Sequence, residues 1–258
     1  MKKSTVYVIA NWKMAPSSIG EAKKLFLNLK KSIGRLARVK AVICPPVAFL
    51  GELRDLYAGA KLNFGVQDIH FEEQGSFTGK ISAQMAKSIG ASYCIIGHSE
   101  LRAYGETDEE INKKVHIALS QKLMVVLCIG EHERDQEGEY LTFLTKELEA
   151  ALKNVPQSAL KNILIAYEPI WAIGKTGDDA MKPVAVYETV LFLRKIVTNI
   201  YDKKSALLVP ILYGGSVEIS NSERLLNEGG IRGFLVGHAS LSSVDFDTIL
   251  HTAETSSI

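Results

Sequence analysis

Cysteine is scarce in this chain, which has three cysteines among 258 residues, Cys44, Cys94 and Cys128. The number is odd, the spacings are wide, and each lies in or beside an apolar run. We therefore expect reduced core residues, with neither a disulfide framework nor a zinc site. Cys128 lies near the end of an expected strand, where we expect it to fill the core.

Charge of one sign and long apolar runs are also lacking. The chain has 30 Lys and Arg against 29 Asp and Glu, so no global field attracts nucleic acid or a membrane, and any attraction for an anionic substrate must be local. No run approaches a membrane span, and the apolar stretch before Asn11 is too short for a signal-peptide core. We expect a cytoplasmic protein without nucleic-acid or membrane partners.

Two nucleotide-binding signatures are missing. No Gly-x-Gly-x-x-Gly follows an expected strand, which weakens the case for a dinucleotide-binding fold. The run Gly174-Lys175-Thr176 matches the end of a P-loop, but Pro169 occupies the position where a P-loop needs glycine.

The chain does contain short apolar runs that alternate with charged segments of helical periodicity. Several of these runs lack any polar alternation, as expected for strands buried on both faces of a parallel sheet. The expected strands are Thr5–Ala10, Lys40–Cys44, Leu62–Val66, Tyr93–Ile96, Met124–Ile129, Ile163–Tyr167, Leu208–Leu212 and Phe234–Val236.

The helical segments complete the pattern. Thr107 and Glu110 form a capping-box signature, Asn227-Glu228-Gly229-Gly230 is a helix stop, and Glu254–Ile258 is expected to fray. Eight strand–helix units of about 32 residues predict an α/β fold, a closed parallel (β/α)8 barrel formed by residues 1–258 as a single domain, in preference to an open doubly wound sheet. The expected helices are Ser18–Ile33, Thr107–Ser120, Tyr140–Leu152, Val184–Ile200 and Ser220–Asn227.

One carboxylate stands at the end of an expected strand. Glu168 follows the run Ile163–Tyr167, and Pro169 then turns the chain into an apolar loop containing Gly174. A glutamate fixed beside a loop that closes over it suits proton abstraction in a water-poor pocket. A solvated strand-end glutamate is the ordinary alternative.

Other polar residues follow other strands, and barrel active sites form at the carboxyl ends of the strands. Each residue alone has an ordinary explanation as a surface, structural or turn residue, but together they are expected to converge on one rim. They are Asn11 and Lys13 after strand 1, His98 and Glu100 after strand 4, Gly214, Gly215 and Ser216 after strand 7, and Gly237 and His238 after strand 8.

The types of these residues suggest enolisation of a small phosphorylated sugar. The backbone N–H groups of Gly214–Ser216 and Gly237 can bind phosphate. His98 and Asn11 can donate hydrogen bonds to a carbonyl or enediolate oxygen, and Glu168 can take a proton from the adjacent carbon.

The chain closely resembles the triosephosphate isomerase family at these positions, in the family's order from residue 11 to residue 239. The resemblance covers nearly the whole chain and is highly specific. The matching motifs are Asn11-Trp12-Lys13, Gly97-His98-Ser99-Glu100, Tyr104-Gly105-Glu106-Thr107-Asp108-Glu109, Tyr167-Glu168-Pro169-Ile170-Trp171-Ala172-Ile173-Gly174, Tyr213-Gly214-Gly215-Ser216-Val217 and Leu235-Val236-Gly237.

The resemblance implies a TIM barrel that interconverts dihydroxyacetone phosphate and glyceraldehyde 3-phosphate without cofactor or metal. It implies Glu168 as the base, His98 as the electrophile that moves a proton between oxygens, Lys13 as the charge stabiliser and Asn11 as a positioning donor, with Glu100 as a carboxylate near Lys13. Phosphate binding is expected from Gly174, Gly214, Gly215, Ser216, Gly237 and the backbone N–H of His238.

The resemblance also implies a homodimer formed through the loop Gly75–Gly79, in which Thr78 reaches the partner's site and Gln67 supports that region. Four features depart from the family pattern: the lid Lys175–Asp179, Leu101 in place of the first of two arginines, Lys80 in place of a glutamate, and His238 in place of a glycine. Two alternatives stay open at this point, a phosphate-binding barrel with poor turnover and another sugar-phosphate isomerase.

Overall fold

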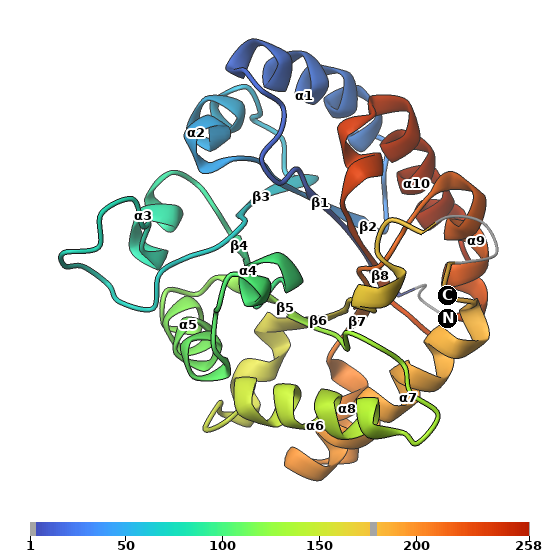
Figure 1. Ribbon diagram of the computed structural model, residues 1–258. Helices are drawn as coiled ribbons and strands as arrows, with labels where there is room; N and C mark the ends of the chain where they lie inside the picture. Colours follow the sequence, from blue (N-terminus) through green and yellow to red (C-terminus); the bar gives the residue numbers. More distant parts are fainter. Residues whose placement is uncertain (1–3, 176–179, 258) are drawn as a thin grey trace.

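The computed structural model describes residues 4–175 and 180–257 and contains a closed barrel of parallel strands in the order β1 to β8. The predicted fold class is therefore confirmed, and Figure 1 shows the helices arranged around the barrel. The strands are β1 Val6–Asn11, β2 Val39–Cys44, β3 Leu62–Val66, β4 Tyr93–Ile96, β5 Met124–Ile129, β6 Ile163–Tyr167, β7 Ile211–Tyr213 and β8 Gly233–Val236.

Both faces of the strands are buried, which explains their continuous apolar sequences. Ile9 belongs to a cluster inside the barrel with Leu164 and Leu212, whereas its neighbour Val8 faces outward and belongs to the larger cluster that includes Phe26 of the first helix. Successive side chains of a strand point to opposite faces, so every position of a two-sided strand must be apolar.

The helices and short 3-10 helices connect these strands and cover the outside of the barrel. The α-helices are α1 Ile19–Ile33, α2 Val47–Asp55, α3 Ala83–Ser88, α4 Ser99–Ala103, α5 Asp108–Ser120, α6 Glu139–Ala151, α7 Pro183–Ile200, α8 Lys203–Leu208, α9 Ile219–Glu228 and α10 Ser243–Thr255; the described 3-10 helices are η1 Gln157–Asn162, η2 Ile170–Ala172 and η4 His238–Leu241.

Helix ends follow the sequence signals where those signals were present. The side chain of Thr107 accepts a hydrogen bond from the backbone N–H of Glu110, and Glu110 reciprocates, so the predicted capping box at the start of α5 is confirmed. Helix α9 ends at Glu228 and is capped by Gly229, as the helix stop predicted. The bounds of the five predicted helices lie within a residue or two of those of α1, α5, α6, α7 and α9.

Three corrections concern the elements. The predicted strand Leu208–Leu212 is wrong at its start, because Asp202 caps a helix that runs to Leu208, and β7 begins only at Ile211. The expected fraying after residue 253 is wrong for Glu254, which lies in α10 and accepts hydrogen bonds from the backbone of residues 37–39. Helices α2, α3, α4 and α10, which follow β2, β3, β4 and β8, were not predicted.

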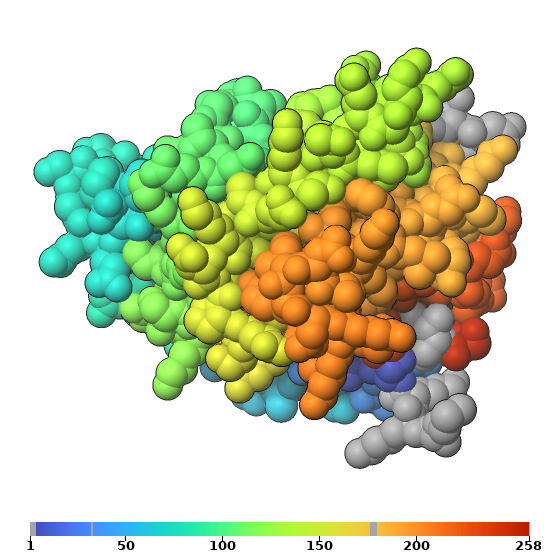
Figure 2. Space-filling view, turned by 90° about the horizontal axis from the view of Figure 1, so that it is seen from below, coloured from blue at the N-terminus to red at the C-terminus, as the bar shows by residue number. Residues whose placement is uncertain are grey.

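A segment between β3 and α3 extends away from the barrel. Residues 72–80 are exposed throughout, and Figures 1 and 2 show this cyan segment projecting beyond the neighbouring elements. Among the described helices, none combines the length and apolar character needed to cross a membrane.

Candidate active site

A cavity of about 670 Å³ opens at the carboxyl ends of the strands and collects most of the predicted site residues. Glu100 and Thr78 are the predicted residues outside its described lining. The predicted residues that line it are Asn11, Lys13, His98, Glu168, Gly174, Gly214, Gly215, Ser216, Gly237 and His238.

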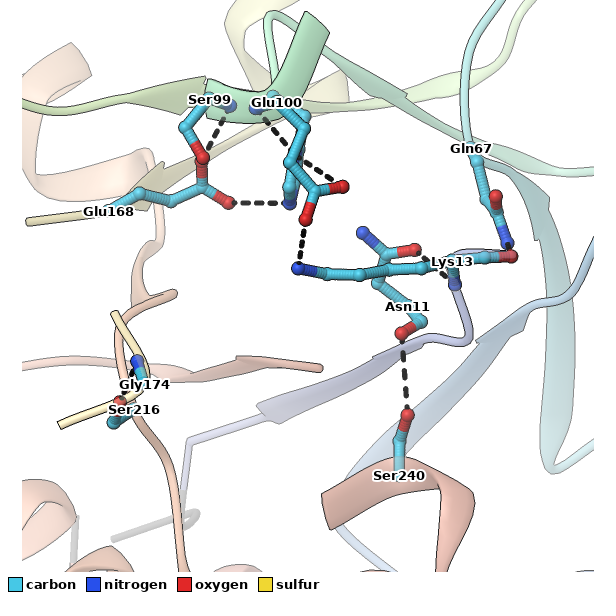
Figure 3. Close-up of polar contacts among 10 residues, drawn as sticks. Asn11, Lys13, Gln67, Ser99, Glu100, Glu168, Gly174, Ser216 and Ser240 are labelled. Carbon is cyan, nitrogen blue, oxygen red and sulfur yellow. Dashed lines mark hydrogen bonds and ion pairs between the residues drawn. The ribbon is translucent and has the colours of Figure 1, made fainter. Parts of the chain in front are cut away.

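Glu168 directly follows β6 and is 2% exposed. One carboxylate oxygen, Oε2, accepts a hydrogen bond from the backbone N–H of Ser99 at 3.1 Å, and the other, Oε1, lies 3.4 Å from Nε2 of His98 (Figure 3). Ser99 is the first residue of α4, where N–H groups have no partner within the helix. Neither helix α4 nor this role of Ser99 was predicted from the sequence.

His98 is the N-cap of α4, and its ring orientation follows from that position. Its Nδ1 accepts a hydrogen bond from the backbone N–H of Glu100 at 3.2 Å. A nitrogen that accepts in this way carries no proton, so the proton of the neutral imidazole lies on Nε2. The ring therefore presents an N–H donor to Glu168 and to the cavity.

Lys13 is held from three sides. Its φ of +52° is unusual for a residue with a side chain, and its backbone N–H donates to Oδ1 of Asn11 at 3.1 Å. Nε2 of Gln67 donates to the Lys13 carbonyl oxygen at 2.8 Å. The ammonium group lies 2.6 Å from Oε1 of Glu100, and Figure 3 shows it pointing toward that carboxylate. These contacts place the charge of Lys13 at the cavity.

Another wall of the cavity consists of the loops after β7 and β8. A Cβ atom at Gly214 would lie 2.9 Å from Cγ of Glu168, so only glycine lets this loop approach the carboxylate so closely. Ser216 Oγ accepts from the N–H of Gly174 at 2.8 Å and donates to the carbonyl of Ala172 at 3.0 Å. These two hydrogen bonds connect the segment that precedes the expected lid, Ala172 to Gly174, with the loop after β7.

Gly237 ends the loop after β8 and precedes η4, in which His238 is exposed at the cavity. A Cβ atom at Gly237 would lie 3.6 Å from Cε of Lys13. The lysine side chain and the N–H groups after β8 are thus close enough to act on one anionic group.

Glu131 was missed by the sequence analysis because no motif marks it. Its Oε1 accepts from the hydroxyl of Tyr167 at 2.7 Å and from Nε1 of Trp171 at 2.9 Å. Its carbonyl oxygen accepts from the N–H of Ile170 at 3.0 Å. Burial, reinforced by Glu131, raises the pKa of Tyr167, so the phenol stays a donor. This buried carboxylate therefore anchors the chain on both sides of Glu168.

Three further expectations can be compared with the structure. Cys128 is buried inside the barrel as expected, and burial, together with the neighbouring Glu168 carboxylate, raises the pKa of its thiol. Leu101 is half-buried and Lys80 is exposed. The expected lid falls largely on residues 176–179, which lie outside the described residues.

The fold and the cavity together define a class, a (β/α)8 enzyme with a carboxylate, a neutral imidazole and an ammonium group facing a wall of backbone N–H donors. The triosephosphate isomerase family model matches residues 6–253. This chain belongs to the triosephosphate isomerase family.

Individual triosephosphate isomerases are similar in sequence to this chain over nearly their full length. The triosephosphate isomerase of Thermoanaerobacter pseudethanolicus is 42% identical over 248 residues, covering 95% of this chain and 98% of the relative. Those of Alkaliphilus oremlandii and Chloroflexus aurantiacus are 40% and 39% identical, each over 95% of this chain and 98% and 97% of the relative.

Proposed function

We propose that this protein interconverts dihydroxyacetone phosphate and D-glyceraldehyde 3-phosphate through an enediolate. The observation that carries the proposal is the placement of the Glu168 carboxylate 3.4 Å from Nε2 of His98, at a cavity that Lys13 also lines. Membership of the family and the names of the relatives agree with this reaction.

The first chemical step is proton transfer from carbon to Glu168. The carboxylate takes the proton from the carbon next to the carbonyl group, and the negative charge moves to the carbonyl oxygen. The Nε2–H of His98 and the ammonium group of Lys13 stabilise this charge as it develops, with the Asn11 amide as a further donor.

The second half of the reaction returns the same proton to the neighbouring carbon. His98 gives its Nε2 proton to one enediolate oxygen and takes a proton from the other, so that the carbonyl group changes place. Glu168 then protonates the carbon that carried the original carbonyl group. Atoms and charges balance within the substrate, and these steps use side chains of this chain alone. The expectation that no cofactor or metal takes part stays a prediction.

The phosphate group is assigned to the wall formed by the loops after β7 and β8. Backbone N–H groups of Gly215, Ser216, Gly237 and His238 are the candidate donors there, and the Lys13 side chain lies beside Gly237. The N–H groups of Gly214 and Gly174, also predicted as donors, instead donate to the carbonyl oxygen of Tyr167 at 2.8 Å and to Oγ of Ser216 at 2.8 Å. This arrangement separates the group that anchors the substrate from the carbon that reacts, which is what a single productive orientation requires.

We infer a homodimer through the loop Gly75–Gly79. In support, residues 72–80 are exposed and this segment projects from the barrel. We infer that Thr78 contacts a second copy. Two large apolar side chains, Met14 and Tyr104, are 98% and 89% exposed and are candidates for the same interface. We also infer that residues 1–258 form one domain. A cytoplasmic location stays a prediction from the sequence.

The test is a coupled assay in which glyceraldehyde 3-phosphate is the substrate and dihydroxyacetone phosphate is reduced as it forms. Turnover at a rate above that of a Glu168→Gln variant would support the proposal. Binding of substrate without turnover would show a phosphate-binding barrel instead.

A further inference from the structure

We propose that Arg102 and Glu147 form a buried positioning pair that holds Glu168 and His98 in their reactive arrangement. Neither residue lines the cavity described above. The inference rests on the proposed isomerase function, and it assigns to this pair the task of fixing the two backbone segments between which the reacting carbon is placed.

Glu147 acts on the end of β5. It lies on α6, is 3% exposed, and its Oε2 accepts a hydrogen bond from the backbone N–H of Gly130 at 2.9 Å. That N–H belongs to the peptide group between Ile129 and Gly130. The carbonyl oxygen of the same peptide group accepts from the backbone N–H of Glu168 at 2.8 Å. A single peptide group therefore connects the carboxylate of Glu147 with the backbone of Glu168.

The contact between these two backbones is unusually close. A Cβ atom at Gly130 would lie 1.7 Å from the carbonyl oxygen of Glu168. Since no side chain fits between the two segments, a shift of the Gly130 peptide must move Glu168. Small displacements matter here, because a misplacement of about 1 Å costs on the order of 100-fold in rate.

Arg102 acts in the same way on the end of β4. Its Nε donates to the carbonyl oxygen of Gly97 at 3.0 Å, which belongs to the peptide group that joins Gly97 to His98. His98 and the following Ser99 hold the Glu168 carboxylate. Arg102 thus positions the segment that carries His98 and Ser99, while Glu147 positions the backbone of Glu168 through the Gly130 peptide group.

The two supports are joined by an ion pair. Nη1 of Arg102 lies 3.1 Å from Oε1 of Glu147 and donates to Oδ1 of Asp108 at 2.6 Å. The planar guanidinium can meet Gly97, Asp108 and Glu147 together, which the single ammonium group of a lysine cannot do. The pair therefore fixes the ends of β4 and β5 relative to each other behind the site.

The charge of Glu147 is sensitive to pH in the working range. Burial raises its pKa to about 7, while Arg102 and the Gly130 N–H lower it, and the carboxylates of Asp108 and Glu168 raise it. These groups come from the loop after β5 and from α4, α5 and the end of β6. Loss of the negative charge weakens the link to Arg102, so this link should be strongest above neutral pH.

The test compares Glu147→Gln with the wild-type protein. The amide has the shape of the carboxyl group but no charge, so we expect a folded protein whose kcat is about 10- to 100-fold lower. Inhibition by inorganic phosphate should change less than about threefold, since the proposed phosphate donors lie in the loops after β7 and β8, which Glu147 and Arg102 do not contact directly. The wild-type kcat should change with pH near pH 7, where Glu147 loses its proton, and this change should be absent in the variant.

A second variant keeps the inference falsifiable if the first disturbs folding. Arg102→Lys retains the positive charge and should lower kcat in the same way. The double variant should lose less than the product of the two single losses, because both residues act through one link.

The matched control is Glu254→Gln. Glu254 also accepts backbone N–H groups, those of Ala37, Arg38 and Val39, but it supports the start of β2 at the other end of the barrel. This variant should lower stability and leave kcat within about twofold. Equal losses of kcat in both variants would show only a general effect of stability and would overturn the inference.

Crystal structures separate this inference from the proposed function. In Glu147→Gln the Glu168 carboxylate should leave hydrogen-bond distance of the Ser99 N–H, a result that can be seen even if the wild-type protein has no turnover. An inactive wild-type protein would refute the proposed function alone. An unmoved Glu168, or a kcat within about threefold of wild type in an active protein, would overturn the positioning role.

Discussion

Replacement of Glu168 by glutamine tests the proposed base most directly. The amide cannot accept the proton from carbon, and general-base contributions are typically about 10²–10⁴-fold, which corresponds to roughly 3–5 kcal/mol of transition-state stabilisation. In addition, the two oxygens of Glu168 face two N–H donors, Ser99 N–H and His98 Nε2–H. A glutamine has only one oxygen, so its NH₂ group must face one of these donors. We therefore expect kcat to fall at least 100-fold.

The measurement is the coupled isomerase assay together with inhibition by inorganic phosphate. The phosphate donors lie on the wall formed by the loops after β7 and β8, so inhibition should stay within about threefold of wild type. Glu223→Gln, which changes an exposed glutamate on α9, is the control and should leave both quantities unchanged. Retention of more than about a tenth of the wild-type kcat would remove Glu168 from the role of base.

Three further predictions concern other residues. His98→Gln should lower kcat more than it weakens inhibitor binding, because its Nε2–H acts on charge that develops during enolisation; equal losses would mark a ground-state binding residue. Thr78→Asp should lower activity and dissociate the inferred dimer, because a buried carboxylate without a partner is costly, and light scattering that finds an unchanged dimer with normal turnover would refute that placement. Glu147 should destabilise the protein as pH rises from about 5 to 8: the folded protein binds the Glu147 proton more tightly than the unfolded chain, so its contribution is full below about pH 4.5 and lost above about pH 7. Denaturant unfolding should show that the free energy of unfolding falls between these pH values by roughly 3 kcal/mol less in Glu147→Gln than in the wild-type protein. An equal pH dependence in both proteins would contradict this prediction.

The strands were predictable because each is a short apolar run bounded by turn residues. Seven of the eight expected strands lie within a residue or so of their positions in the structure, and the exception, β7, shows why boundaries are harder. The residues before β7 are as apolar as the strand, and only the cap at Asp202 and the packing of α8 make Leu208 helical. Helix α3 is too short to show a clear period, whereas α10 has buried residues at helical spacing that could have been recognised.

The candidate residues at the cavity could also be named from the sequence. Each lies at the end of a strand or in the loop that follows it, and the carboxyl ends of parallel strands in a barrel all lie on one rim. This reasoning found Glu168, His98 and Lys13, but it missed Glu131 and Glu147. These two glutamates lie in no motif, and their partners are far away along the chain.

The sequence by itself determined which segments form strands and which chemical groups stand at their ends, because both depend on residue type and on neighbours along the chain. Only the tertiary structure decided which of those groups touch. The Ser99 N–H reaches Glu168 across 69 positions, and Arg102 reaches Glu147 across the space between α4 and α6. Such contacts depend on closure of the barrel and on how the helices pack around it, and no local pattern encodes the resulting distances.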